Sequence, residues 1–174
     1  MNKIHSLLFV AATFVQTPHV EAAPTLHSSH DLQQGHVTST IGTPGRIENV
    51  DRTIEIFVRE TGSGDMLFDP DVVHIEHDTT IRFIVSNTGS LVHELVLGTF
   101  DEIEQRRQSF RRNPDLPHDV ASAVKVPAGE TAEIVWKFSS IMNLEYACLI
   151  PGHREAGMWG VIIVHDHLAP RSKS

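Results

Sequence analysis

The chain has 174 residues, 40% of them hydrophobic, and its 22 acidic against 14 basic side chains give a net charge of −8. This length is enough for one domain with its own core, and the acidic balance argues against nucleic acid and anionic membranes as partners. The single cysteine cannot form an internal disulfide, so its presence calls for another explanation.

Residues 1–22 have the pattern of a secretory signal peptide. Lys3 supplies a positive start, residues 7–15 form an apolar run too short to span a membrane, and residues 20–22 offer a small-residue cleavage site. Cleavage near Ala22 would deliver the protein to the periplasm. No later segment is long and apolar enough for a transmembrane helix, so we expect no membrane insertion after cleavage.

Residues 23–50 are polar with little apolar periodicity, which predicts a flexible arm. A short tail is expected at 168–174. Histidines in both regions are candidates for weak additional metal binding, since histidine-rich tracts bind metals, although incidental histidines in solvated tails are the simpler interpretation. These candidates are His27, His30, His36, His165 and His167.

Residues 51–167 predict one β-rich domain. Apolar and polar residues alternate along 53–59 and 81–85, as expected for strands with one buried face. Seven or eight such short strands, separated by turn residues, indicate a Greek-key β-sandwich. His74 and His77 would face opposite sides of one strand and are interpreted as structural, and no partner is assigned to His118.

One helical excursion interrupts the strands. Thr99 and Glu102 form a capping box, Ile103 and Phe110 follow at helical spacing, and residues 113–114, Asn-Pro, end the run. Four basic side chains on this helix are either a docking patch or simply a solvated helix face. They are Arg106, Arg107, Arg111 and Arg112.

The most informative stretch is residues 146–160, followed by the apolar run 161–164. It contains the only cysteine, Cys148, then His153 and Met158, each five positions further on. Leu144, Tyr146 and Cys148 share one strand parity, which would leave Cys148 pointing inward at the end of a strand. The segment is therefore expected to be a ligand loop between two strands.

A thiolate, an imidazole and a thioether form a soft donor set, and a second imidazole completes the arrangement that suits copper in both oxidation states. The best candidate for that imidazole is His93, where a turn leads into an apolar strand. Residues 151–152, Pro-Gly, and Gly157 stand where the chain must turn back for Cys148 and His153 to reach one ion.

The paired motifs resemble those of the cupredoxins, the family of plastocyanin, azurin, rusticyanin and auracyanin. The match includes His-Glu-Leu-Val-Leu-Gly at 93–98 and Cys-Leu-Ile-Pro-Gly-His-Arg-Glu-Ala-Gly-Met at 148–158, and the likeness runs from about Asp51 to His165. It is greatest to the bacterial periplasmic copper-tolerance cupredoxins. The resemblance implies one type 1 copper ion, cycling between Cu(I) and Cu(II), and places the mid-chain histidine beside the late loop at one end of the sandwich. The implied ligands are His93, Cys148, His153 and Met158.

Two positions depart from the pattern of plastocyanin and azurin. Those proteins have Asn after the first histidine and Ser or Thr after the cysteine, and these side chains help to tie the ligand loops together, whereas this chain has Glu94 and Leu149. Residues beside the ligands tune a metal centre, so its reduction potential and colour do not carry over. We hypothesise that Glu94 is one of these residues beside the ligands.

Other interpretations of Cys148 account for less of the loop. A buried structural thiol leaves His153 and Met158 unexplained, and a thioether is a poor fourth donor for zinc. A hydrolase nucleophile needs a nearby base and usually a helix N-terminus or positive surroundings, whereas Cys148 is expected at the end of a strand.

The expected function is therefore non-enzymatic, in copper tolerance, one-electron transfer with a redox partner protein, or both. A dedicated electron carrier and an accessory subunit of a copper enzyme remain as alternatives. A copper oxidase or nitrite reductase would need further His-x-His motifs, for which residues 165–167 are a poor substitute.

Overall fold

The computed structural model describes residues 40–167. The expected signal peptide at 1–22, the histidines His27, His30 and His36 of the arm, and the tail at 168–174 lie outside the described residues. Within the described part of the chain, no helix is long and apolar enough to cross a membrane.

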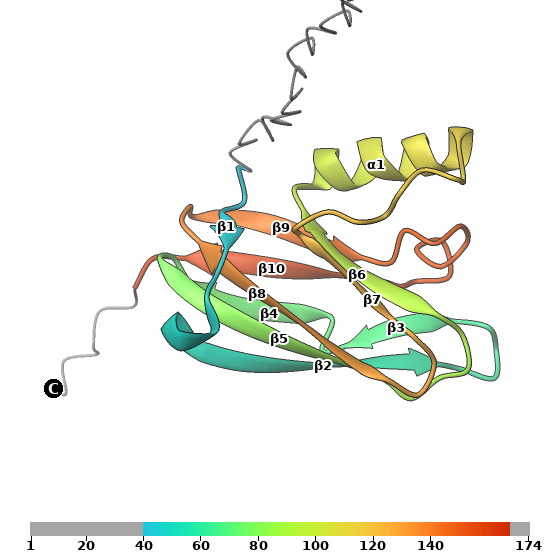
Figure 1. Cartoon of the computed structure of the whole chain (residues 1–174), viewed down its shortest axis with the longest axis horizontal. Coiled ribbons are helices and arrows are strands. Elements are labelled where there is room, and N and C mark those ends of the chain that lie inside the picture. Colours follow the sequence, from blue (N-terminus) through green and yellow to red (C-terminus); the bar gives the residue numbers. More distant parts are fainter. Residues whose placement is uncertain (1–39, 168–174) are drawn as a thin grey trace, which may run out of the picture. The chain divides into compact units, whose positions relative to one another are not determined.

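Two five-stranded sheets pack face to face (Figure 1). The first sheet has the order β1 (Thr43–Pro44), β8 (Thr131–Phe138), β5 (Thr79–Asn87), β2 (Arg52–Glu60) and β3 (Met66–Asp69). The second has the order β4 (Val72–Glu76), β10 (Trp159–His165), β9 (Met142–Ala147), β6 (His93–Gly98) and β7 (Ala123–Val126). The all-β sandwich is therefore confirmed, with ten strands in the described residues.

The core lies between the two sheets and follows the period-two alternation of the strands. In β2 the buried side chains are every second residue, and β5 places Phe83 and Val85 in the same core. Trp136 of β8 is among the largest buried side chains, and Leu144 and Tyr146 of β9 face it from the second sheet. Because successive side chains of a strand point to opposite faces, the sequence alternation was sufficient to predict this core.

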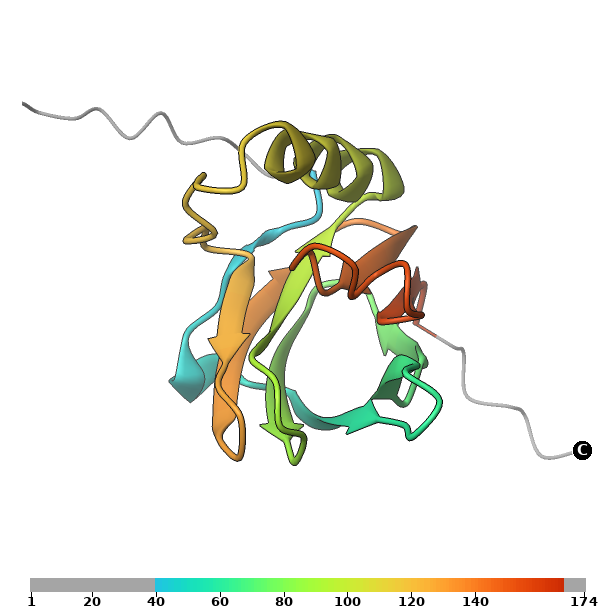
Figure 2. The same cartoon turned by 90° about the vertical axis from the view of Figure 1, so that its right-hand side faces the viewer.

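One helix, α1 (Phe100–Arg112), covers the outer face of the second sheet beside the β9–β10 loop (Figure 2). The predicted capping box is present, with Glu102 N donating to Thr99 Oγ1 at 3.1 Å and Thr99 N donating to Glu102 Oε2 at 2.8 Å. A small second core forms under the helix from Val96, Ile103, Phe110, Ala147 and Leu149. β6 is therefore buried on both faces, by the first sheet on one side and by α1 on the other.

The end of the expected arm belongs to the folded domain, so the boundary at residue 50 is a correction. β1 pairs with β8, a short 3₁₀ turn covers Ile47–Asn49, and Ile41 is 2% exposed while its carbonyl accepts from Trp136 Nε1 at 3.1 Å. Gly42 has a φ of +119°, and a Cβ there would meet Lys137 O at 2.0 Å. A lone isoleucine among polar neighbours shows no periodicity, and its burial depends on a partner 95 residues away.

Candidate metal centre

The two predicted ligand segments meet at one end of the sandwich (Figure 2). His93 is the first residue of β6, and Cys148 directly follows β9, which pairs with β6 in antiparallel register. Cys148 is fully buried in the main core with Leu144 and Tyr146, as their shared strand parity predicts. The pairing of β6 with β9 thus brings together residues that are 55 positions apart.

Three donor atoms converge at this end. His93 Nδ1 lies 3.2 Å from His153 Nδ1, and Cys148 Sγ lies 3.4 Å from the same His153 nitrogen. Among the described residues, this is the only group of three or more His, Cys, Asp or Glu side chains whose ligand atoms lie within 4.8 Å of one another. Two donors bound at about 2.0 to 2.3 Å in a tetrahedral or trigonal arrangement stand roughly 3.3 to 3.7 Å apart. The cluster has the right size for one ion.

The loop between β9 and β10 folds back on itself as its glycines predict. Gly152 and Gly157 adopt φ values of +90° and +101°, a region that favours glycine. Cys148 N donates to Met158 O at 3.1 Å, and Met158 N donates to His153 O at 3.1 Å. These bonds tie the three loop candidates together through the backbone, and Met158 is fully buried in the main core.

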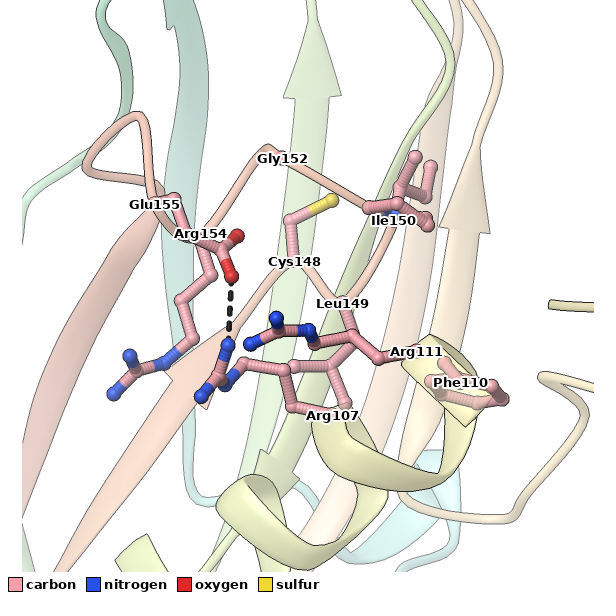
Figure 3. A pocket seen from close by; sticks show the side chains of 10 residues that line it. Arg107, Phe110, Arg111, Cys148, Leu149, Ile150, Gly152, Arg154 and Glu155 are labelled. Carbon is pink, nitrogen blue, oxygen red and sulfur yellow. Dashed lines mark hydrogen bonds and ion pairs between the residues drawn. The ribbon is translucent and has the colours of Figure 1, made fainter. Parts of the chain in front are cut away.

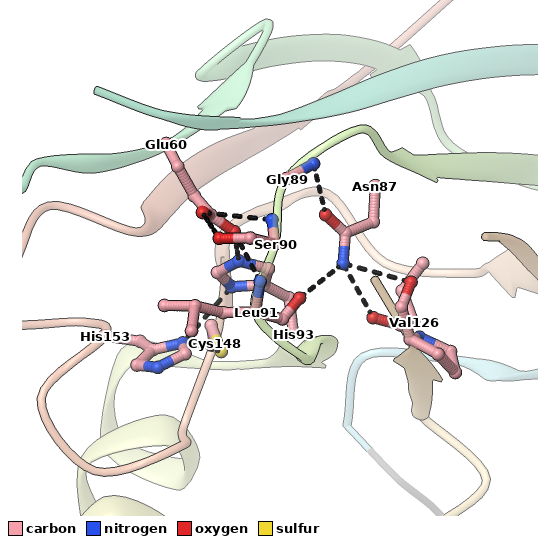
Figure 4. A network of polar contacts seen from close by, with 10 residues as sticks. Glu60, Asn87, Gly89, Ser90, Leu91, His93, Val126, Cys148 and His153 are labelled. Atoms are coloured by element: carbon pink, nitrogen blue, oxygen red, sulfur yellow. Dashed lines mark hydrogen bonds and ion pairs between the residues drawn. The ribbon is translucent and has the colours of Figure 1, made fainter. Parts of the chain in front are cut away.

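Glu60, at the end of β2, holds His93 from the other side (Figure 4). His93 Nε2 donates to Glu60 Oε1 at 2.9 Å, which leaves Nδ1 of the same ring facing the cluster. Leu91 N and Ser90 N also donate to this carboxylate, at 2.9 and 3.1 Å. These bonds, with His93 the largest contribution, lower the pKa of Glu60 to about 2. A carboxylate on the far nitrogen orients a ligating imidazole and raises its basicity.

The turn before His93 is built to admit that carboxylate. Asn87 Nδ2 donates to Leu91 O at 2.8 Å and to Val126 O at 3.0 Å, while Asn87 Oδ1 accepts from Gly89 N at 2.9 Å. A Cβ at Gly89 would lie 2.1 Å from Glu60 Oε1. Only glycine allows this approach, so the position of His93 is set before any metal binds.

Glu94 links the two ligand segments. It is 3% exposed, its Oε1 accepts from Leu149 N at 2.9 Å, and its Oε2 accepts from His118 Nδ1 at 2.8 Å. The His118 ring also stacks on Phe110, with centroids 3.8 Å apart and planes at 1°. His118 therefore has partners that sequence reasoning did not identify. The contact between Glu94 and the residue after Cys148 supports the hypothesised role of Glu94 beside the centre.

The other side of the loop is anchored by ion pairs. Arg154 Nε donates to the buried Glu145 at 2.7 Å, and Arg107 of α1 donates to Glu155 at 2.7 Å (Figure 3). A pocket of about 330 Å³ lies here between α1 and the loop, with Cys148 and Arg111 among its lining residues. Arg107 is thus neither a docking charge nor simply solvated, because it fastens the helix to the ligand loop.

The remaining histidine candidates lie elsewhere. His165 is the last residue of β10 and His167 follows it, at the ends of strands that lead away from the ligand loop. His74 and His77 are on or just after the neighbouring β4. The structure does not bring any of these four side chains into the cluster around Cys148.

Comparison with known proteins decides the family. The model of copper binding proteins of the plastocyanin/azurin family matches residues 56–165. The chain is 39% identical over 160 residues to the copper-resistant cuproprotein CopI of Rubrivivax gelatinosus, covering 91% of this chain and 94% of that protein. The chain belongs to the plastocyanin/azurin family. A CopI of Vibrio cholerae is 34% identical over 139 residues, covering 79% of this chain and 78% of that protein.

Solved structures show the same fold. Auracyanin B aligns with a TM-score of 0.59 at 23% identity, covering 71% of this chain and 96% of that one. An auracyanin of Roseiflexus castenholzii aligns with a TM-score of 0.55 at 20% identity, covering 67% and 98% of the two chains. The resemblance to cupredoxins expected from the sequence motifs is therefore confirmed.

The donor chemistry of the cluster fits copper. Two imidazoles and a thiolate are the three strong donors of trigonal copper sites, and a thioether is their usual weak axial donor. Burial lowers the pKa of His153, and the neighbouring His93 lowers it further, so its ring stays neutral and able to ligate near pH 7. Burial also raises the pKa of the Cys148 thiol to about 12. The positive charge of a bound metal ion would offset the cost of burying the thiolate, so that the ligating thiol loses its proton.

The raised pKa predicts an unreactive thiol in the copper-free protein. At pH 8 we expect iodoacetamide to alkylate folded, metal-free Cys148 at least about a hundredfold more slowly than the urea-unfolded chain, because only the thiolate attacks and the folded thiol is both neutral and buried. Mass spectrometry over time would measure this, with no second cysteine to confuse the product. Equal rates in the two states would show that the thiol is open to solvent.

Proposed function

We propose that this protein is a periplasmic, non-enzymatic copper-tolerance cupredoxin that holds one copper ion through His93, Cys148, His153 and Met158. The observation that carries the proposal is the convergence of His93 Nδ1, Cys148 Sγ and His153 Nδ1 in a buried cluster. The role in tolerance is supported by the CopI proteins, which are named copper-resistant and align along 91% and 79% of this chain. The periplasmic location is supported by the signal pattern at 1–22.

Copper held there would exchange one electron between Cu(I) and Cu(II). The chain supplies a rigid pocket for this, since Glu60 fixes His93, Glu94 fixes the backbone after Cys148, and Arg154 fixes the loop. Rigid positioning keeps the ligands in one geometry in both oxidation states.

Electron exchange with a redox partner protein has its own support. His153 is 9% exposed, whereas His93, Cys148 and Met158 are fully buried, so His153 is the proposed ligand nearest to solvent. Exposed apolar side chains on the neighbouring segments offer a contact area around it, namely Leu67, Leu91, Val92 and Trp159. A partner at this face would approach the copper through the His153 ring.

A Cu(II) titration of the purified protein tests the site. One equivalent should produce an intense thiolate-to-copper absorption band that ascorbate bleaches and reoxidation restores. Cys148→Ser should abolish the band, and Met158→Leu should shift it. Met142→Leu is the matched control because it removes a thioether from β9 outside the loop. A wild-type protein without the band would overturn the proposed ligand set.

Tolerance needs a separate measurement. Export of the protein in a copper-sensitive bacterium should raise the copper concentration that halves growth, and Cys148→Ser should remove that gain. If the band forms but growth is unaffected, the protein is a dedicated electron carrier rather than a tolerance factor.

A further inference from the structure

Four histidines gather at the end of the sandwich opposite the copper loop. β4 and β10 run parallel, and their final residues lie beside each other at the side where the chain leaves β10 (Figure 1). Seven residues of β10 separate this end from the loop, a length of roughly 20 Å in a strand. The histidines are His74, His77, His165 and His167.

Strand register places the histidines together. His165 is opposite Glu76 and Ile163 is opposite His74, so these side chains share the outer face of the sheet. His77 N donates to His165 O at 2.9 Å, which continues the pairing beyond the end of β4. The backbone therefore brings two distant stretches of chain into one cluster.

Two pairs of metal-type donors are already formed there. His77 Nε2 lies 3.0 Å from Asp166 Oδ1, and His167 Nδ1 lies 2.7 Å from Glu76 Oε2. The rings of His77 and His167 have centroids only 5.0 Å apart. Two neighbouring ligands at right angles around an ion with bonds of about 2.0 Å stand roughly 2.8 Å apart. Each pair thus has the spacing of two adjacent ligands on one ion.

The cluster is open to solvent, because the Asp166 and His167 side chains are mostly exposed. A pocket of about 450 Å³ lies beside it between the ends of the two sheets, lined by His74, Glu76 and His165 among others. Arg52 is in the same pocket, but its Nη1 donates to His74 O at 2.9 Å and is held there. Asp78 accepts from the second nitrogen of His77 at 3.1 Å, an arrangement that orients a ligating imidazole.

We propose that His77, His167, Asp166 and Glu76 form a second metal site that takes Cu(II). Imidazole and carboxylate donors suit Cu(II) rather than Cu(I), and Cu(II) binds nitrogen and oxygen sites more tightly than other divalent ions of its row. The choice of copper rests on the proposed function, whereas the site itself rests on the four side chains.

This second site is adjustable, in contrast to the buried cluster. The His167 and Asp166 side chains are 57% and 76% exposed, so their rotation can bring the two pairs onto one ion. Ordering exposed side chains costs conformational entropy, so binding is weaker than at Cys148. The site would take up Cu(II) at the opposite end of the molecule from the sulfur-containing centre.

The test uses the full chain carrying His93→Ala, Cys148→Ser and His153→Ala, which removes the three strong donors of the buried centre. Cu(II) should still bind and give an EPR spectrum of nitrogen and oxygen ligands without a thiolate band. Adding His77→Ala and His167→Ala should weaken this binding at least tenfold, and Asp166→Asn alone should weaken it severalfold. The matched control replaces His27, His30 and His36 of the arm with alanine and should leave this affinity unchanged.

An affinity that stays within twofold in the His77/His167 variant overturns the proposal, as does loss of the binding in the arm variant. Thermal unfolding of the metal-free variants checks that the fold is intact, and Asp166→Asn provides a milder change. The outcome is independent of the proposed function, because the charge-transfer band of the wild-type protein reports the Cys148 site separately.

Discussion

Replacing Glu60 with glutamine is expected to raise the reduction potential of the copper-loaded protein by roughly 50 to 100 mV. Glu60 accepts from His93 Nε2 at 2.9 Å, and its pKa of about 2 keeps it ionised at neutral pH. A negative charge one imidazole away from the ion stabilises Cu(II) more than Cu(I). Glutamine keeps the size and an acceptor oxygen but removes the charge.

The magnitude follows from Coulomb's law. A unit charge about 6 Å from the ion contributes roughly 2 to 3 kcal/mol at an effective dielectric constant near 20. For a one-electron couple this corresponds to about 100 mV. The Glu60 side chain is 20% exposed, so solvent screening lowers the effect.

Spectroelectrochemical titration would measure the shift, with Glu55→Gln as the matched control, since Glu55 is an exposed carboxylate on the same strand. A Glu60→Gln potential within about 20 mV of wild type would contradict the electrostatic role.

The stability of the copper-free proteins as a function of pH offers a second test of the Glu60 contact. Because the folded pKa of Glu60 lies below its ordinary 4.5, its stabilising contribution is present above pH 4.5 and is lost as the pH falls towards 2. Wild type should therefore lose stability more steeply than Glu60→Gln across that window.

Replacing Glu94 with alanine is expected to lower the free energy of unfolding of the copper-free protein by about 3 kcal/mol. The buried Leu149 N–H would lose its acceptor, His118 would lose its carboxylate partner, and a cavity would remain between the two ligand segments. An unsatisfied buried donor alone costs roughly 1 to 3 kcal/mol, and the lost contact with His118, whose side chain is 29% exposed, adds up to about 1 kcal/mol.

Urea unfolding of the metal-free variants would measure this loss. Glu94→Gln keeps an acceptor for Leu149 N and should cost less than half as much, while His118→Gln tests the outer contact alone. If Glu94→Ala costs below about 1 kcal/mol, the carboxylate does not fasten the two segments. An unchanged copper spectrum and potential in Glu94→Gln would separately remove Glu94 from any role in tuning the centre.

The sequence by itself determined the local features of this protein. Period-two alternation predicted the strands, the Thr99–Glu102 capping box predicted the start of the helix, and the spacing of Cys148, His153 and Met158 predicted a folded-back loop. Each of these depends on residues within one element or one turn, where side-chain direction follows from backbone geometry. His93 could be predicted as a ligand because it follows a turn, begins an apolar strand and belongs to a family motif.

Only the tertiary structure decided what surrounds those elements. Glu60 reaches His93 across 33 residues and His118 reaches Glu94 across 24, while Ile41 is covered by Trp136 across 95. None of these residues has a distinctive local pattern. A hydrogen bond between distant side chains depends on strand order, register and the path of the connecting loops. Alternation specifies which face of a strand is buried, but it does not specify which strand lies next to it, so these partners became visible only when the sheets were assembled.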